Sequence, residues 1–224
     1  MSCAAVLVVA KAPVAGSAKT RLAADVGDTA AADLAAAALL DTLAVCADVF
    51  GARVLALTGD LACAARRDEL ERAIADWHVI EQRGVNFGER LAHAHEDAAD
   101  HVRQPVLQLG MDTPQVTSGQ LEELDSMLGA RYDAVLGPAD DGGWWALGVT
   151  GPALVDGLGS VPMSSSRTGE ETLRLLRDNG AGVWIGETLS DVDVVADAVA
   201  VSETFPGLRF SSAWAAASGA RGAS

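Results

Sequence analysis

The sequence alternates between short continuous apolar runs and longer amphipathic segments. Residues 4–10 form an uninterrupted Val-rich apolar run, which is typical of a strand buried on both faces. Further strands are predicted at residues 53–58, 77–81, 105–109, 133–136, 144–149 and 182–185. Helical periodicity predicts helices at residues 29–50, 61–76, 87–103, 118–128, 170–178 and 194–202.

The order of these elements predicts the fold class. Strands and helices alternate over the first 130 residues or so, which indicates βαβ units and a mostly parallel sheet. The strands around residues 133–149 are separated only by a Gly-rich turn, so the C-terminal half departs from that pattern. We therefore expect a single-domain, three-layer α/β/α, Rossmann-like fold over residues 1–210. Residues 211–224, rich in Ala, Ser and Gly, are predicted to form a flexible tail.

Composition narrows the class of protein. The 224 residues include 16 Lys and Arg against 31 Asp and Glu, and half are hydrophobic. Such a chain is too apolar to be disordered and, with a net charge of −15, too acidic for a general nucleic-acid binder. Asp41 and Asp48 interrupt the Ala-rich stretch at 33–50, so no membrane span is expected. We expect a cytoplasmic protein, and the Ala-rich helical face is compatible with a homodimer.

Ligands of open α/β sheets bind beyond the carboxyl ends of the strands. The loop after the first strand carries Lys11, Lys19 and Arg21 in an otherwise acidic chain. A cationic, Gly-containing loop at this place suits a triphosphate, because it offers backbone N–H groups and positive charge. It matches neither GxxxxGK[ST] nor GxGxxG. The alternative interpretation is a solvated basic turn.

Acidic residues follow two other strands. Asp112 stands three residues after the strand at 105–109, where it can hold Mg²⁺ together with substrate phosphates, or else cap a helix or a turn. Asp191 and Asp193 follow the last strand, and their spacing puts two carboxylates on one face of an extended segment. The turn at 140–143 pairs two acids with two glycines, which allows close approach of a ligand. Charge or glycine at four strand ends favours one shared site.

Together these segments carry a family resemblance. The pattern Lys11-Ala-Pro-x-x-Gly16-x-x-Lys19-Thr-Arg21-Leu22, followed by Gly110-x-Asp112-x-Pro114, Asp140-Asp141-Gly142-Gly143-Trp144 and Asp191-Val-Asp193, resembles the GT-A nucleotide-diphospho-sugar transferase superfamily. It is most similar to the bacterial glycosyltransferase-like branch, and distantly similar to 2-phospholactate guanylyltransferase through residues 18–22. The resemblance covers about residues 4–200. The first loop differs from the Gly-Gly-x-x-x-Arg-Met loop of better-known sugar nucleotidyltransferases. The substrates of those enzymes are therefore not assigned to this chain.

The resemblance implies a role for each part of the site. The residues implied to bind the nucleotide are Lys11, Pro13, Gly16, Lys19, Arg21, Gln82 and Gly88, of which the last two lie in the segment implied to read the base. Asp112 and Asp193 are implied to hold Mg²⁺ or Mn²⁺. The implied acceptor-side residues are Asp141, Gly142, Gly143, Trp144, Ser165, Arg167 and Thr168. The implied catalytic residues are Lys19, Arg21 and Asp112.

The favoured reaction is metal-dependent nucleotidyl transfer from a nucleoside triphosphate to a phosphorylated small-molecule acceptor, with release of pyrophosphate. Two lysines in the first loop favour a triphosphate over a diphosphate-sugar. The alternatives are a glycosyltransferase that uses a nucleotide-diphospho-sugar and a non-catalytic nucleotide-binding module. His93 and His95 lie two residues apart on a predicted helix, so they face different directions and are predicted to be surface or capping residues.

Overall fold

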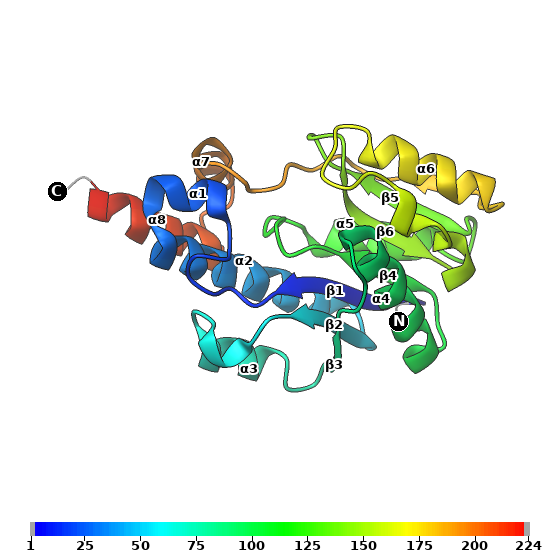
Figure 1. The fold of residues 1–224 in the computed structure, drawn as a ribbon, viewed down its shortest axis with the longest axis horizontal. Coiled ribbons are helices and arrows are strands. Elements are labelled where there is room, and N and C mark those ends of the chain that lie inside the picture. The colour runs from blue at the N-terminus through cyan, green and yellow to red at the C-terminus, as the bar shows by residue number, and fades with distance from the viewer. Residues whose placement is uncertain (1–2, 222–224) are drawn as a thin grey trace.

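The computed structural model describes residues 3–221, which are built around a seven-stranded sheet in the order β3-β2-β1-β4-β6-β5-β7 (Figure 1). The strands are β1 (Ala5–Lys11), β2 (Arg53–Thr58), β3 (His78–Glu81), β4 (Val106–Leu109), β5 (Ala134–Pro138), β6 (Trp144–Val149) and β7 (Val183–Ile185). Strands β1 to β4 are parallel, whereas β6 runs antiparallel to both of its neighbours, β4 and β5. The expected mostly parallel sheet with a modified second half is confirmed.

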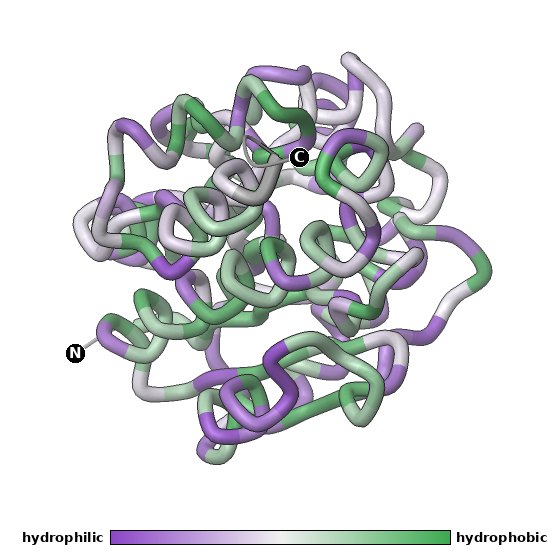
Figure 2. Tube along the Cα trace, turned by 90° about the vertical axis from the view of Figure 1, so that its left-hand side faces the viewer, coloured by the Kyte–Doolittle hydropathy of each residue, from purple (hydrophilic) through white to green (hydrophobic). Residues whose placement is uncertain are grey.

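Helices cover both faces of this sheet. They are α1 (Thr20–Val26), α2 (Asp28–Val49), α3 (Arg67–Ala73), α4 (Phe87–Val102), α5 (Ser118–Met127), α6 (Thr168–Asp178), α7 (Val195–Thr204) and α8 (Arg209–Arg221). In β1, Val6 and Val8 face the layer of α2, α3 and α5, while Leu7 and Val9 face the layer of α4 and α6. Hydrophobic and hydrophilic stretches alternate along the helices in Figure 2, as expected where one side of each helix is buried. The three-layer α/β/α prediction is confirmed.

A third apolar cluster joins the two ends of the chain. Helices α1, α7 and α8 pack around α2 at one end of the molecule (Figure 1). The buried Asp41 carboxylate on α2 accepts hydrogen bonds from the backbone N–H groups of Arg209 (3.1 Å) and Phe210 (2.9 Å) at the start of α8. The predicted flexible tail is therefore wrong for residues 211–221, because Phe210 and Trp214 are buried against α2; residues 222–224 lie outside the described residues.

By length and composition, helix α2 is long and apolar enough to cross a membrane. It is the single such helix in the described part of the chain. However, 72% of its most apolar window is buried inside the protein. We therefore identify α2 as a core helix.

Two local predictions need correction. The helix predicted at 61–76 is divided into a 3₁₀ turn at Leu61–Cys63 and α3, because Arg66 adopts a left-handed conformation with φ of 52°. The segment after β1 was predicted to be a loop without a helix, but it contains α1. That helix positions the cationic loop considered next.

Candidate functional site

Two cavities meet at the carboxyl ends of the central strands. The larger, of about 350 Å³, extends from β1 and β4 to the loops that follow β5 and precede α6. The smaller, of about 200 Å³, lies between the loop after β1 and the segment after β7. Asp112 lines both cavities. The four strand ends singled out in the sequence thus converge on one place.

Lys19 closes the loop after β1 onto this site. Its Nζ lies 2.6 Å from Asp112 Oδ1 and 2.6 Å from the carbonyl oxygen of Val192, and its side chain is only 4% exposed. The residue has φ of 43° and ψ of 53°, a left-handed conformation that is uncommon outside glycine. The backbone at the start of α1 therefore aims the ammonium group at the Asp112 carboxylate.

Arg21 and Asp193 form a second, looser pair at the small cavity. Arg21 Nη1 lies 3.2 Å from Asp193 Oδ2, and the two side chains are 75% and 51% exposed. Exposed ion pairs of this kind contribute little to stability. Both groups are therefore available to a ligand at small energetic cost.

Asp191 is the carboxylate that the sequence analysis left without a role. It lines the large cavity, and burial raises its pKa to about 7. Part of that rise comes from the nearby carboxylates of Asp112, Asp141 and Asp193, whereas Lys19 opposes it. In the sequence, the alternation of Asp191 and Asp193 after the last strand was the pattern that could have indicated that Asp191 belongs to the site. These neighbouring carboxylates place an excess of negative charge at the junction of the two cavities.

This donor set can be compared with the needs of a divalent cation. Asp112 and Asp193 line the small cavity together, and their side chains are 45% and 51% exposed. Among residues 3–221, no group of three or more His, Cys, Asp or Glu side chains is placed to hold a metal. Two carboxylates with a carboxylate-rich surrounding fit Mg²⁺, which commonly completes its coordination with water and substrate phosphates.

The Gly142–Gly143 turn is locked against the loop before α6. Gly142 has φ of 88°, and a Cβ there would lie 2.2 Å from the carbonyl oxygen of Ser166. The N–H of Gly169 donates to the Gly142 oxygen at 2.8 Å, and the N–H of Gly143 donates to Asp141 Oδ1 at 2.7 Å. Glycine is required at 142 by both conformation and space. This contact builds one wall of the large cavity.

The loop before α6 is itself held by hydroxyl groups. Thr168 Oγ1 donates to the Pro162 oxygen at 2.7 Å and accepts from the Ser165 N–H at 3.1 Å. Trp144 Nε1 donates to Thr172 Oγ1 at 3.2 Å, which fixes the indole beside the same wall. Ser164 lines the cavity with φ of 56°, a left-handed conformation stabilised by this loop.

The structure distributes the predicted site residues as follows. The large cavity is lined by Lys11, Gln82, Asp112, Asp141, Gly143, Trp144, Ser165 and Thr168. The small cavity is lined by Lys19, Arg21, Asp112 and Asp193. Neither cavity is lined by Pro13, Gly16, Gly88, Gly142 or Arg167. Gly88 has a packing role, since a Cβ there would lie 2.5 Å from the carbonyl oxygen of Leu158.

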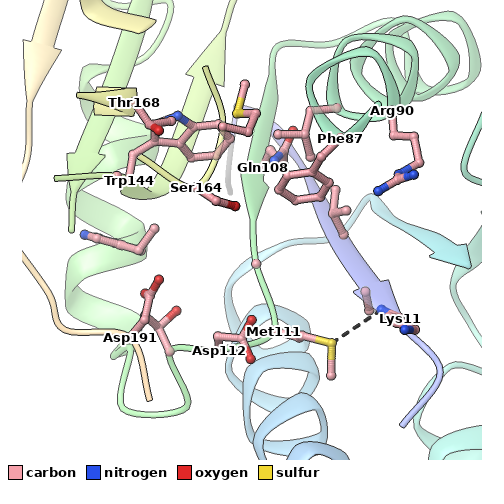
Figure 3. Close-up of a pocket in the computed structure, with 18 of the residues that line it drawn as sticks. Lys11, Phe87, Arg90, Gln108, Met111, Asp112, Trp144, Ser164, Thr168 and Asp191 are labelled. Carbon is pink, nitrogen blue, oxygen red and sulfur yellow. Dashed lines mark hydrogen bonds between the residues drawn. The ribbon is translucent and has the colours of Figure 1, made fainter. Parts of the chain in front are cut away.

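Gln82 and the residues missed in the sequence complete the large cavity. Gln82 Nε2 donates to the carbonyl oxygens of Ala10 (2.8 Å) and Ala56 (2.9 Å), so it ties the ends of β1 and β2 together. Arg90 and Gln108 also line the cavity (Figure 3). Gln108 could have been noticed in the sequence because it is the lone polar residue within the apolar run at 105–109. His95, predicted as a surface or capping residue, is fully buried on the inner face of α4, and that prediction is wrong.

Comparison with known proteins places this geometry in context. A family profile described as "Uncharacterized protein conserved in bacteria (DUF2064)" matches residues 39–165. A "putative nucleotide-diphospho-sugar transferase" from Desulfovibrio desulfuricans G20 shares 26% identity at a TM-score of 0.82, over 95% of this chain and 94% of that one. Among curated proteins, no sequence matches this chain.

Two further solved enzymes have the same fold at low identity. A 4-diphosphocytidyl-2C-methyl-D-erythritol synthase has a TM-score of 0.55 at 13% identity, over 90% of this chain and 97% of that one. The inositol-1-phosphate CTP transferase from T. maritima has a TM-score of 0.53 at 14% identity, over 88% and 92%. These neighbours are transferases, and the expected GT-A-like fold and superfamily resemblance are confirmed.

Proposed function

This chain belongs to the DUF2064 family of bacterial proteins, and we propose that it is a metal-dependent nucleotidyltransferase that transfers a nucleoside monophosphate to a phosphorylated small-molecule acceptor. The observation that carries the proposal is the junction at Asp112. A small cavity with loop cations and carboxylates suits polyphosphate, and a larger, mostly apolar cavity beside it suits an organic group.

The reaction needs positioning and charge more than a protein nucleophile. An acceptor phosphate oxygen attacks the α-phosphorus of the triphosphate, the bond from that phosphorus to the bridging oxygen breaks, and pyrophosphate leaves. Lys19 and Arg21 would offset the charge on the departing pyrophosphate. The wall formed by the Gly142 turn would orient the acceptor, which lowers the entropic cost of reaction.

Asp112 and Asp193 would hold the metal, Mg²⁺ or Mn²⁺. Support comes from their shared cavity and from the other carboxylates beside it, Asp141 and Asp191. When bound, the ion would supply positive charge to the phosphate oxygens. In the structure Lys19 provides the countercharge to Asp112, so a bound ion and Lys19 would share that carboxylate.

Glycosyl transfer is the second candidate. It is favoured by the 26% identity to the Desulfovibrio protein over nearly the whole of both chains. The same cavities would then take a nucleotide-diphospho-sugar, the acceptor oxygen would attack the sugar C1, and a nucleoside diphosphate would leave. A cytoplasmic location and a homodimer stay predictions from the sequence.

A thermal-shift panel of nucleoside triphosphates and nucleotide-sugars, each with and without Mg²⁺ or Mn²⁺, separates the candidates. A ligand at 100 times its Kd adds about 2.7 kcal/mol of stability, which such a measurement detects. Metal-dependent stabilisation by a triphosphate supports nucleotidyl transfer, and stabilisation by a nucleotide-sugar alone moves the assignment to glycosyl transfer. Stabilisation by neither contradicts the proposal.

Matched variants test the assigned residues. Asp112→Asn should remove the metal dependence of triphosphate binding, because it loses a carboxylate that would hold the ion. Lys19→Met should weaken binding by about tenfold or more, because it loses a positive charge that faces the phosphates. Asp178→Asn, at an exposed position of α6 outside both cavities, is the control and should bind normally. Unchanged metal dependence in Asp112→Asn would contradict the metal assignment.

A further inference from the structure

Arg90 is a cation with no ion-pair partner among residues 3–221. It stands in the first turn of α4, lines the large cavity, and its guanidinium lies 5.6 Å from the centroid of the Phe87 ring. Its Nε is buried without a hydrogen-bond partner, and no ion pair joins it to any carboxylate within residues 3–221. Acids outnumber bases 31 to 16 in this chain, so the lack of a partner is unexpected. A half-buried charge of this kind is costly unless something pairs with it.

Gln108 lies in the same cavity with an incomplete set of hydrogen bonds. Its side chain on β4 is among the buried polar groups, with the residue 2% exposed. Within the described residues its Oε1 has no hydrogen-bond partner by distance and angle, although His95 lies beside it. The neighbouring His95 on α4 is fully buried; burial lowers its pKa to about 4, and its contact with the Gln108 side chain opposes that effect. Neutral imidazole carries one N–H, which can donate to Oε1 and leave the amide NH₂ for a ligand.

The two ends of the large cavity therefore carry different kinds of polar group. Figure 3 shows Arg90 and Asp191 on opposite sides, with Gln108 and Phe87 between them and Trp144 facing across. Carboxylates gather at the Asp191 side, whereas the Arg90 side offers hydrogen-bond donors. Apolar side chains, including Met163 and Leu91, line the remainder. A ligand that fills this space would place an acceptor group near Arg90 and an apolar body against the rings.

We propose that Arg90 and Gln108 form an oxyanion subsite that binds a carboxylate or phosphate carried on an apolar group. The guanidinium fork and the amide present donors, and oxyanions are acceptors that pair strongly with arginine. The inference rests on the proposed function only in that the ligand would be the acceptor of the transfer. It assigns the anion of that acceptor to α4 and β4, away from the cationic loop after β1.

Three small probes of similar shape test the subsite: benzoate, phenyl phosphate and uncharged benzyl alcohol. Binding is followed by ligand-observed NMR titration in the absence of nucleotide. Benzoate or phenyl phosphate should bind more tightly than benzyl alcohol, and the tighter of the two identifies carboxylate or phosphate as the preferred anion. Arg90→Gln should weaken binding of that anion by about tenfold or more while leaving benzyl alcohol unchanged.

Two further variants keep the result interpretable. Arg131→Gln, at an exposed arginine outside the cavity, should bind the probes as the wild type does. Gln108→Leu should weaken anion binding severalfold, since leucine removes the amide donors that face the ligand, and a thermal melt checks that the variant is folded. Equal anion binding by wild type and Arg90→Gln, both folded by thermal melt, would overturn the subsite.

The same variants separate this inference from the proposed function. A triphosphate should stabilise Arg90→Gln and wild type equally in the presence of Mg²⁺. If Arg90→Gln loses triphosphate binding, Arg90 serves the nucleotide and the subsite is wrong. If no nucleotide stabilises the wild type but the anionic probes still bind through Arg90, the proposed function fails and the subsite stands.

Discussion

His95 should make the stability of this protein depend on pH in a predictable direction. The imidazole is fully buried, and its pKa falls from an ordinary 6.5 to about 4 because burial disfavours the charged form. In the unfolded chain the same ring takes up a proton near pH 6.5. Because the unfolded state binds the proton first, acid favours unfolding; the contribution of His95 is complete above pH 6.5 and is lost as the pH falls toward 4.

The two pKa values set the size of the effect. The difference between 6.5 and about 4 corresponds to about 3 kcal/mol of unfolding free energy lost by pH 4, and about 2 kcal/mol of this is lost by pH 5. Domains of this kind are stable by only about 5–15 kcal/mol, so the loss is a large share of the total. Asp191 acts in the opposite direction, since its raised pKa makes the folded state take up a proton near pH 7.

Urea unfolding at pH 7 and pH 5 measures the effect, with His95→Gln as the perturbation. The glutamine does not titrate, so the variant should lose about 2 kcal/mol less than the wild type between the two pH values, whatever its absolute stability. All other titrating groups, Asp191 included, are common to both proteins and cancel in this comparison. His93→Gln, two residues away with its ring Nδ1 2.9 Å from the Arg83 oxygen, should retain the wild-type loss. Equal losses in wild type and His95→Gln would refute the reasoning.

Gly142→Ala should cost roughly 2–4 kcal/mol, because it combines a left-handed conformation with a Cβ that would lie 2.2 Å from the Ser166 oxygen. Gly151→Ala, where no atom lies within 4 Å of the added Cβ, is the control, and an equal Tm for the two variants would contradict this account. Asp41→Ala should cost about 2–4 kcal/mol and expose α8 to proteases, since it leaves the Arg209 and Phe210 N–H groups without their buried acceptor. The exposed Asp48→Ala should change neither urea stability nor the proteolysis pattern; protection of α8 in Asp41→Ala would show that apolar packing alone holds it.

Some of the site could be located from the sequence because its signals are local. Strands buried on both faces read as apolar runs, and the residues that follow them occupy the ligand-binding edge of a parallel sheet. This reasoning located Lys19, Asp112 and Asp193, which the structure brings together at the small cavity. It also placed the Gly142 turn at this edge, although Gly142 acts through its contact with Ser166. Gln82, which lines the large cavity, was implied only by the family resemblance.

Other features depended on which distant segments pack together. Periodicity did not reveal that β6 lies between β4 and β5, since strand order is decided by long-range pairing. The Ala- and Ser-rich end of the chain becomes α8 only because Asp41 and the apolar face of α2 receive it. An Ala- and Ser-rich composition is compatible both with a free tail and with a helix that packs against a surface of small residues, so composition alone did not distinguish them.

The chemistry of the large cavity shows the same division. The sequence by itself determined the fold class and the cationic and acidic strand ends, because burial and turn chemistry are encoded by neighbouring residues. Only the tertiary structure decided that His95 is buried beside Gln108, that Arg90 has no carboxylate partner in the described part of the chain, and that Asp191 joins the acidic cluster. Burial, charge pairing and pKa depend on residues far away in the chain, and these are known only when the fold has brought them together.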